Sequence, residues 1–250
     1  MIGIAGGLDL WTIRAGMAVC FAGGMVGGLS GYGTGLLVAL FITPVIGPKA
    51  LIPVMSVMML INNGGRVFFY REATDWRLVL RISAASVPMA WLGAELYVQL
   101  EGSAIQVLLG AVLIASVPMR RIVARRQLKP GPLAIYAIGG IFGFISSILL
   151  GSGMLILPTL MGLGLAGPAL LATDAAIAVV VNLAKAVIFG ALDALELPMA
   201  ALAVVMGLCT IPGTAVASIV VRRTSLRLHT WLIEALLILG GASMIWRAVA

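Results

Sequence analysis

Residues 28–35 read GLSGYGTG, so glycine occupies four of eight positions between two apolar segments. A helix does not run easily through Gly31, Gly33 and Gly35, because each glycine costs about 1 kcal/mol relative to alanine. In lipid, irregular backbone survives only beside protein or a water-filled cavity. We interpret the stretch as a break in a membrane helix that faces an internal site. Close packing of helices through small residues is the alternative.

The composition of the 250-residue chain is that of a membrane protein. Hydrophobic residues make up 62% of the chain and charged residues 10%, whereas soluble domains are roughly 45–50% apolar and about 25% charged. Apolar stretches of roughly 18 or more residues recur, each long enough to cross the hydrocarbon core. The sequence therefore predicts an all-α, polytopic integral membrane protein with about 8–10 membrane segments.

The net charge is +7, and basic residues gather in short loops such as 120–129 and 222–227. Such loops are typical of the cytoplasmic side of membrane proteins, so we expect a lipid bilayer and no nucleic acid as partner. Cys20 and Cys209 lie in apolar segments without a further Cys or a nearby His, a pattern that predicts neither a metal site nor a disulfide framework. We expect no cofactor.

The two halves of the chain repeat one another. Matching residues recur in the same order at offsets of 118–120 positions: Gly47-Pro48 as Gly167-Pro168, Asn62 as Asn182, and Gly33-Thr34-Gly35 as Gly151-Ser152-Gly153. We expect a first transmembrane repeat at 1–120, a basic cytoplasmic linker at 121–132 and a second repeat at 133–250.

Each half has the same order of apolar segments. The long segments are predicted at 10–30, 49–70, 77–98 and 103–119, and again at 133–149, 168–190, 197–220 and 227–248. A short segment follows the first long one in each half, at 34–46 and 152–164. Thirteen residues span roughly 20 Å of helix, so these segments either cross the membrane incompletely or turn back as re-entrant helices.

Loop charge gives the orientation. The loops at 71–77 and 222–227 and the linker are basic and are expected inside, whereas the turns at 99–102 and 191–196 lack Lys and Arg and are expected outside. Equivalent turns of the two halves then lie on opposite faces, and both termini lie outside. This is an inverted-topology repeat, an arrangement common among secondary transporters.

Two helix breaks at corresponding places in inverted halves predict a site near the midplane of the membrane. The N–H groups that begin the short helices suit an anion, and Thr34 and Ser152 add hydroxyl groups at equivalent positions. The candidate backbone residues are Gly33, Thr34, Gly35, Gly151, Ser152 and Gly153.

Polar side chains within the long segments extend this candidate site. Asn62 precedes Arg66 by four residues, and Asn182 precedes Lys185 by three, so each amide shares a helix face with a cation. Intramembrane cations are usually functional, and these four residues would make an electropositive pocket suited to an oxyanion. The alternative is that Arg66 and Lys185 extend to the two membrane surfaces.

Asp174 has no counterpart in the first half, where Val54 stands at the equivalent position. Three interpretations remain open for this carboxylate. It could carry a coupling proton, pair with a cation such as Lys185, or lie near the membrane surface.

Gly28-Leu29-Ser30-Gly31 also has the G-x-S-G spacing of an intramembrane serine protease, for which the chain offers only His229 as a base. His229 follows a basic stretch at the start of a segment, so we expect an exposed interfacial residue and no enzyme. A nucleotide-phosphate loop lacks the required Gly-Lys-Ser/Thr. A passive anion channel is a closer competitor, because it would share the electropositive pocket.

The sequence resembles the TauE/SafE family of bacterial sulfite and sulfonate exporters over nearly its whole length. The similar stretches are GGLSGYGTGLL at 27–37, ATDWRLVLRI at 73–82 and LLATDAAIAVVVNLAKAVIFG at 170–190. Family members often have Gly-x-Gly-Gly-Gly where this chain has Gly31-Tyr32-Gly33-Thr34-Gly35. The difference implies a changed pocket size.

The resemblance implies a secondary transporter that exports a small organic or inorganic sulfur oxyanion across the bacterial inner membrane without ATP. The termini would then be periplasmic. Sulfite, sulfonates and sulfocarboxylates all remain as substrates, and the oligomeric state stays open, a homo-oligomer included.

Overall fold

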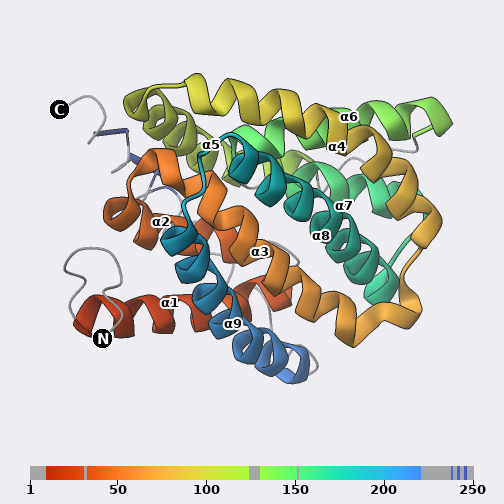
Figure 1. Ribbon diagram of the computed structural model, residues 1–250. Helices are drawn as coiled ribbons and strands as arrows, with labels where there is room; N and C mark the ends of the chain where they lie inside the picture. The colour runs from red at the N-terminus through yellow and green to blue at the C-terminus, as the bar shows by residue number, and fades with distance from the viewer. Residues whose placement is uncertain are drawn as a thin grey trace.

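The computed structural model describes residues 10–30, 33–123, 130–150 and 152–220, together with positions 238, 241, 242, 245 and 246. In this part of the chain the regular structure is helical, with no strand, as the sequence predicts (Figure 1). The helices are α1 (Leu10–Ser30), α2 (Thr34–Ile46), α3 (Pro48–Tyr70), α4 (Trp76–Gln99), α5 (Gly102–Val123), α6 (Pro132–Ile148), α7 (Gly153–Gly162), α8 (Gly167–Ala191) and α9 (Leu197–Val220).

These bounds confirm the predicted order of long and short helices. The short helix of the first half is Thr34–Ile46 as predicted, and that of the second half is Gly153–Gly162. One difference concerns α5, which continues to Val123 and so enters the stretch assigned to the linker. Arginine is a good helix former, so Arg120 and Arg121 extend the helix. Most of the predicted segment at 227–248 lies outside the described residues.

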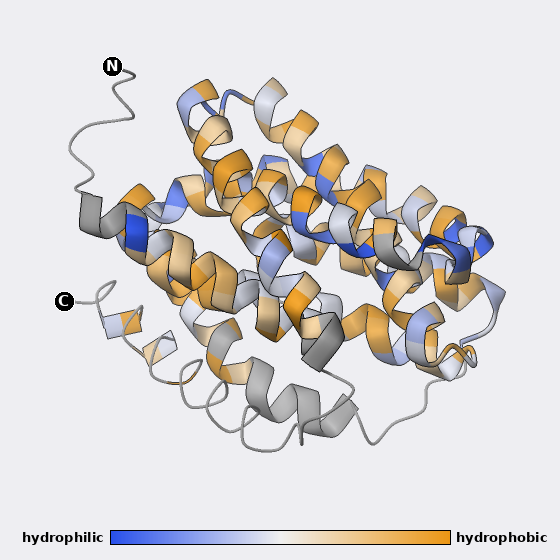
Figure 2. Ribbon diagram, turned by 90° about the horizontal axis from the view of Figure 1, so that it is seen from below, coloured by the Kyte–Doolittle hydropathy of each residue, from blue (hydrophilic) through white to orange (hydrophobic). Residues whose placement is uncertain are grey.

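The chain is a multi-pass membrane protein. Three of the described helices contain stretches long and apolar enough to cross a bilayer: Pro48–Phe68, Gly167–Ala191 and Leu197–Ala217. Shorter apolar helices accompany them, among them Thr34–Ile46 and Pro132–Ile148. Apolar residues predominate along the helices (Figure 2). Large apolar side chains such as Leu80 and Val187 stand exposed on the outer surface, where lipid would cover them.

Helices from the two halves pack against one another in two reciprocal pairs. The first helix of each half packs on the fourth helix of the other, α1 on α9 and α4 on α6. In Figure 1, α4 and α6 lie along the top and α1 and α9 along the bottom, with α3 and α8 between them. Because Gly139 meets Ile82 and Gly143 meets Ser86, α4 and α6 run parallel.

Glycine residues allow the helices of each pair to pack closely. The two interfaces are called here the α1/α9 seam and the α4/α6 seam. A Cβ at Gly143 would collide with the backbone carbonyl of Ser86, and one at Gly24 with that of Thr210. The helices therefore approach almost backbone to backbone, as small residues allow in membranes. The Ser86 hydroxyl donates to Gly139 O across the α4/α6 seam at 2.8 Å.

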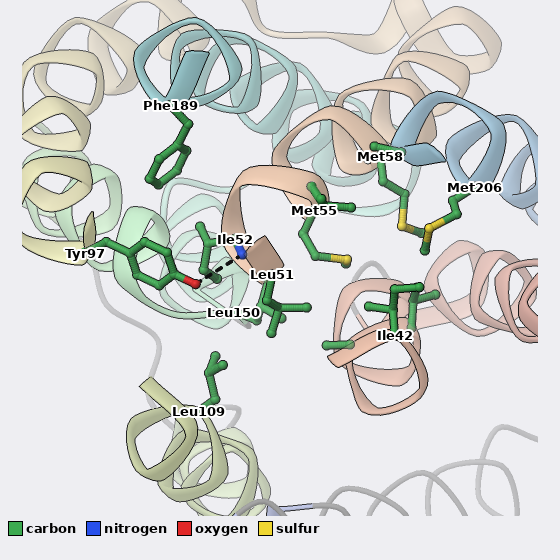
Figure 3. Close-up of a cluster of buried hydrophobic side chains, with 14 of the residues drawn as sticks. Ile42, Leu51, Ile52, Met55, Met58, Tyr97, Leu109, Leu150, Phe189 and Met206 are labelled. Carbon is green, nitrogen blue, oxygen red and sulfur yellow. Dashed lines mark hydrogen bonds between the residues drawn. The ribbon is translucent and has the colours of Figure 1, made fainter. Parts of the chain in front are cut away.

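A buried cluster around Tyr97 joins α3, α4 and α8 (Figure 3). The Tyr97 ring packs edge-on against Phe189, with ring centroids 5.7 Å apart. Its hydroxyl donates to Pro48 O at 2.7 Å and accepts from Ile52 N at 3.4 Å. An ideal helix would join these two backbone groups directly. The hydroxyl thus ties the first turn of α3 to the end of α4.

Replacing Gly143 by alanine tests the α4/α6 seam. We expect Gly143→Ala to lower the free energy of unfolding by about 1–3 kcal/mol, because the new methyl group forces the two helices apart. The matched control is Gly190→Ala in α8, where nothing lies within 4 Å of an added Cβ. Thermal unfolding in detergent measures both variants. Equal melting temperatures for Gly143→Ala and the wild type would contradict the close packing.

Candidate functional site

A cavity of about 100 Å³ lies between the central helices and the two short ones. Its lining combines backbone at the starts of α2 and α7 with polar side chains from α3, α6 and α8. The charged, polar and glycine residues of this lining are Gly33, Gly35, Asn63, Arg66, Ser146, Ser152, Gly153, Asp174, Asn182 and Lys185.

The start of α2 opens into the cavity because of Gly33. This residue has φ 112°, in the left-handed region that side chains rarely tolerate, and it ends the break before the helix. Leu37 N donates to Gly33 O at 3.0 Å. The N–H groups of Thr34, Gly35 and Leu36 therefore lack intrahelical acceptors, and Gly35 and Leu36 line the cavity.

The start of α7 faces the same cavity. Leu155 N donates to Ser152 O at 2.9 Å, which leaves the N–H groups of Gly153 and Met154 without acceptors inside the helix. Ser152 and Gly153 line the cavity. Two helix N-termini, one from each half, thus direct partial positive charge toward one space, an arrangement that favours an anion.

Lys185 places the Nζ of a basic side chain at this space. Its side chain is buried, and its Nζ donates to Ser146 O of α6 at 2.9 Å. Within the described ranges it forms no ion pair, since the one found there joins Arg66 and Asp174. An ammonium group has three N–H donors, so Lys185 keeps donors for a further acceptor.

Asn182 stands one helical turn before Lys185 on the same face of α8. Its side chain is 9% exposed and lines the cavity. A ligand in the cavity could therefore accept a hydrogen bond from its amide nitrogen.

Arg66 and Asp174 meet across the interface of α3 and α8. The distance from Arg66 Nη2 to Asp174 Oδ2 is 3.5 Å, and both side chains are buried. Arg66 Nη1 also donates to Asn63 Oδ1 at 3.1 Å. Charge-assisted hydrogen bonds usually measure about 2.7–2.9 Å, so the carboxylate is held loosely while Asn63 holds the guanidinium.

A second contact fixes the start of α8 against α4. The Thr173 hydroxyl accepts from Asp75 N at 3.0 Å. The Asp75 carboxylate in turn caps α4 by accepting from Arg77 N at 3.0 Å and Leu78 N at 3.1 Å. The neighbour of Asp174 therefore anchors its helix, which sets the position of Asp174 relative to Arg66.

The structure brings most of the residues singled out in the sequence to this cavity. Those in its lining are Gly33, Gly35, Arg66, Ser152, Gly153, Asp174, Asn182 and Lys185. The partner of Asp174 is Arg66 and not Lys185.

Two of the singled-out residues do not line the cavity. The Thr34 hydroxyl donates to Gly23 O of α1 at 2.9 Å, and Asn62 Oδ1 accepts from Thr214 of α9 at 3.3 Å. Gly151 lies outside the described residues, as do His229 and the side chain of Ser30, so the structure gives no geometry for the protease hypothesis.

Sequence reasoning missed Asn63 and Ser146, both of which line the cavity. Asn63 lies three residues before Arg66 and therefore on the same helix face, a signal that was available. The repeat directed attention to its neighbour Asn62 instead. Ser146 left no signal, because its contribution to Lys185 is a backbone carbonyl that any residue carries.

A family model described as sulfite exporter TauE/SafE matches residues 16–244 of the chain. Neither the curated proteins nor the solved structures contain a match.

The buried ion pair between Arg66 and Asp174 leads to a prediction about the stability of the protein. We expect Arg66→Met to lower the free energy of unfolding by about 3 kcal/mol, because Asp174 would remain buried without its cation. The double variant Arg66→Met/Asp174→Leu should lose less than the sum of the two single variants. Arg77→Met, at an exposed position of α4, is the control. Denaturation in detergent measures the cycle, and strictly additive losses would contradict a coupled pair.

Proposed function

The chain belongs to the sulfite exporter TauE/SafE family, and we propose that it is a secondary transporter for a small sulfur-containing anion: sulfite, a sulfonate or a sulfocarboxylate. The anion would bind in the cavity between α2, α3, α6, α7 and α8. Alternating access would then carry it across the bacterial inner membrane, in the exporting direction.

One observation carries this proposal: Lys185 is buried beside the cavity with no carboxylate partner in the described part of the chain. An ammonium group inside a membrane protein is costly unless something compensates its charge. Arg66 and Asp174 offset one another, so Lys185 is the basic group of the described lining that has no carboxylate partner. An anion between Lys185, Asn182 and the two helix N-termini would supply the missing partner.

The packing of the helices supports an inverted repeat. Arg66, near the end of α3, contacts Asp174 and Leu171 near the start of α8, so these equivalent helices run in opposite directions. In addition, the first helix of each half packs on the fourth helix of the other half, once in each seam. An inverted repeat has both features: equivalent helices that run in opposite directions, and reciprocal contacts between the halves. It also places the two short helices around one central site. The termini would then be periplasmic.

Asp174 would couple transport to a proton. The carboxylate lies in the cavity lining and holds Arg66 through a long contact. Protonation would remove the negative charge beside Arg66, so the guanidinium would attract the anion more strongly. A passive anion channel gains nothing from such a carboxylate, which favours a coupled transporter.

Replacing Lys185 tests the site. We expect Lys185→Met to weaken sulfite binding about 10–100-fold, because a hydrogen bond to a charged group contributes about 1.5–3 kcal/mol. Lys49→Met is the matched control, since Lys49 is exposed at the start of α3 and does not line the cavity. Equilibrium binding to purified protein measures both. Undiminished sulfite binding by a folded Lys185→Met protein would remove this residue from the site.

Replacing Asp174 tests the coupling. We expect Asp174→Asn to retain flux in proteoliposomes but to lose its response to an imposed pH gradient, because the amide cannot take up a proton. Glu72→Gln, at an exposed position between α3 and α4, should respond as the wild type does. A gradient response that persists in Asp174→Asn would assign the coupling to another group. Flux that never saturates in the wild type would indicate a channel.

A further inference from the structure

The chain holds two cysteines, which stand 189 positions apart in different halves. Cys20 lies in α1 and Cys209 in α9, and neither is in a disulfide. Both line one apolar crevice of about 60 Å³, away from the anion cavity, together with residues such as Met17, Phe41 and Met206. The proposed transport function uses neither thiol.

The α1/α9 seam sets the register between these residues. Small residues recur every four positions on each helix: Cys20, Gly24 and Gly28 on α1, and Cys209, Gly213 and Ala217 on α9. Each residue of the first set stands 189 positions before its counterpart in the second. Residues four apart share a helix face. Each helix therefore has its three small residues in a row on one face, and the two rows have the same spacing.

Contacts across the seam agree with this register. A Cβ at Gly28 would lie 2.7 Å from the Cβ of Ala217, its partner in this register. A Cβ at Gly24 would collide with Thr210 O and one at Gly213 with Phe21 O, each three positions before the register partner, so these two contacts are centred on the same register. Residue numbers therefore increase together on the two helices, which run parallel. The pair of cysteines stands one helical turn before these contacts. It occupies the place where the next pair of small residues would meet.

Both thiols lie in the same apolar environment. Cys20 is 1% exposed, and Cys209 packs against the same buried hydrophobic cluster. A disulfide needs Cα atoms about 4.4–6.8 Å apart. Two helices reach this separation where small residues let them pack closely, as the glycines do in this seam. The sequence alone could not pair residues so far apart in the chain.

We propose that Cys20 and Cys209 form a cross-helix dithiol that closes to a disulfide and covalently joins the two halves at the α1/α9 seam. Two S–H bonds break and one S–S bond forms, while two electrons and two protons pass to a two-electron oxidant such as a peroxide, which becomes water. The crevice is lined almost wholly by apolar side chains, so small uncharged oxidants are the class that reaches it.

The test uses the full chain with a specific protease site inserted in the linker at 121–132. Purified protein is oxidised with diamide, cleaved and run on a gel without reductant. We expect the two halves of the wild type to migrate as one species, and to separate after reduction. Cys20→Ser and Cys209→Ser should each give separate halves under both conditions.

A register control distinguishes a specific pair from two mobile thiols. In the double variant Leu208→Cys/Cys209→Ser the second thiol moves by one position to a side chain that is exposed in the structure, so we expect no cross-link. The proposal is overturned if the folded wild type gives separate halves, if it gives only cross-linked dimers, or if the shifted cysteine links as readily as Cys209. Oxidation should also raise the melting temperature of the wild type alone.

Discussion

A backbone that stops being helical inside a bilayer must find partners for its N–H and C=O groups within the protein. This constraint organises the molecule. Gly33, in the left-handed region, ends the first break and directs the start of α2 inward, and Ser152 stands directly before α7, which begins across the cavity at Gly153. The N–H groups that begin both helices then face one cavity, so the requirement that makes the breaks costly also creates an environment that favours an anion.

The packing of the long helices positions the residues around this cavity. Close glycine packing fastens α1 to α9 and α4 to α6, so each half depends on a helix from the other. Between these pairs, α3 and α8 cross in opposite directions and carry the charged side chains. Asn63 holds Arg66, Ser146 holds Lys185, and Asp75 holds Thr173. Arg66 is therefore held from within its own helix, Lys185 from α6, and the neighbour of Asp174 from the start of α4.

Much of the fold was predictable from the sequence, because apolar segment length and glycine breaks are local properties. Helix bounds such as Thr34–Ile46 follow from them directly. Most of the residues that line the cavity were predictable from the sequence, but the contacts between them were not. Internal repetition pointed to Asn62, whereas α3 turns Asn63 into the cavity and Asn62 toward α9. The contact between Arg66 and Asp174 spans 108 positions and depends on the crossing of two helices, which no local pattern specifies.

The most direct measurement is to locate a bound anion. Selenite has the charge and shape of sulfite, and its selenium atom scatters anomalously, so crystals soaked in selenite would show where the anion lies. The account predicts one selenium peak inside the cavity, within hydrogen-bonding reach of Lys185 Nζ and of the N–H groups that begin α2 and α7. A peak outside the cavity, or an empty cavity in a protein that binds selenite in solution, would contradict it.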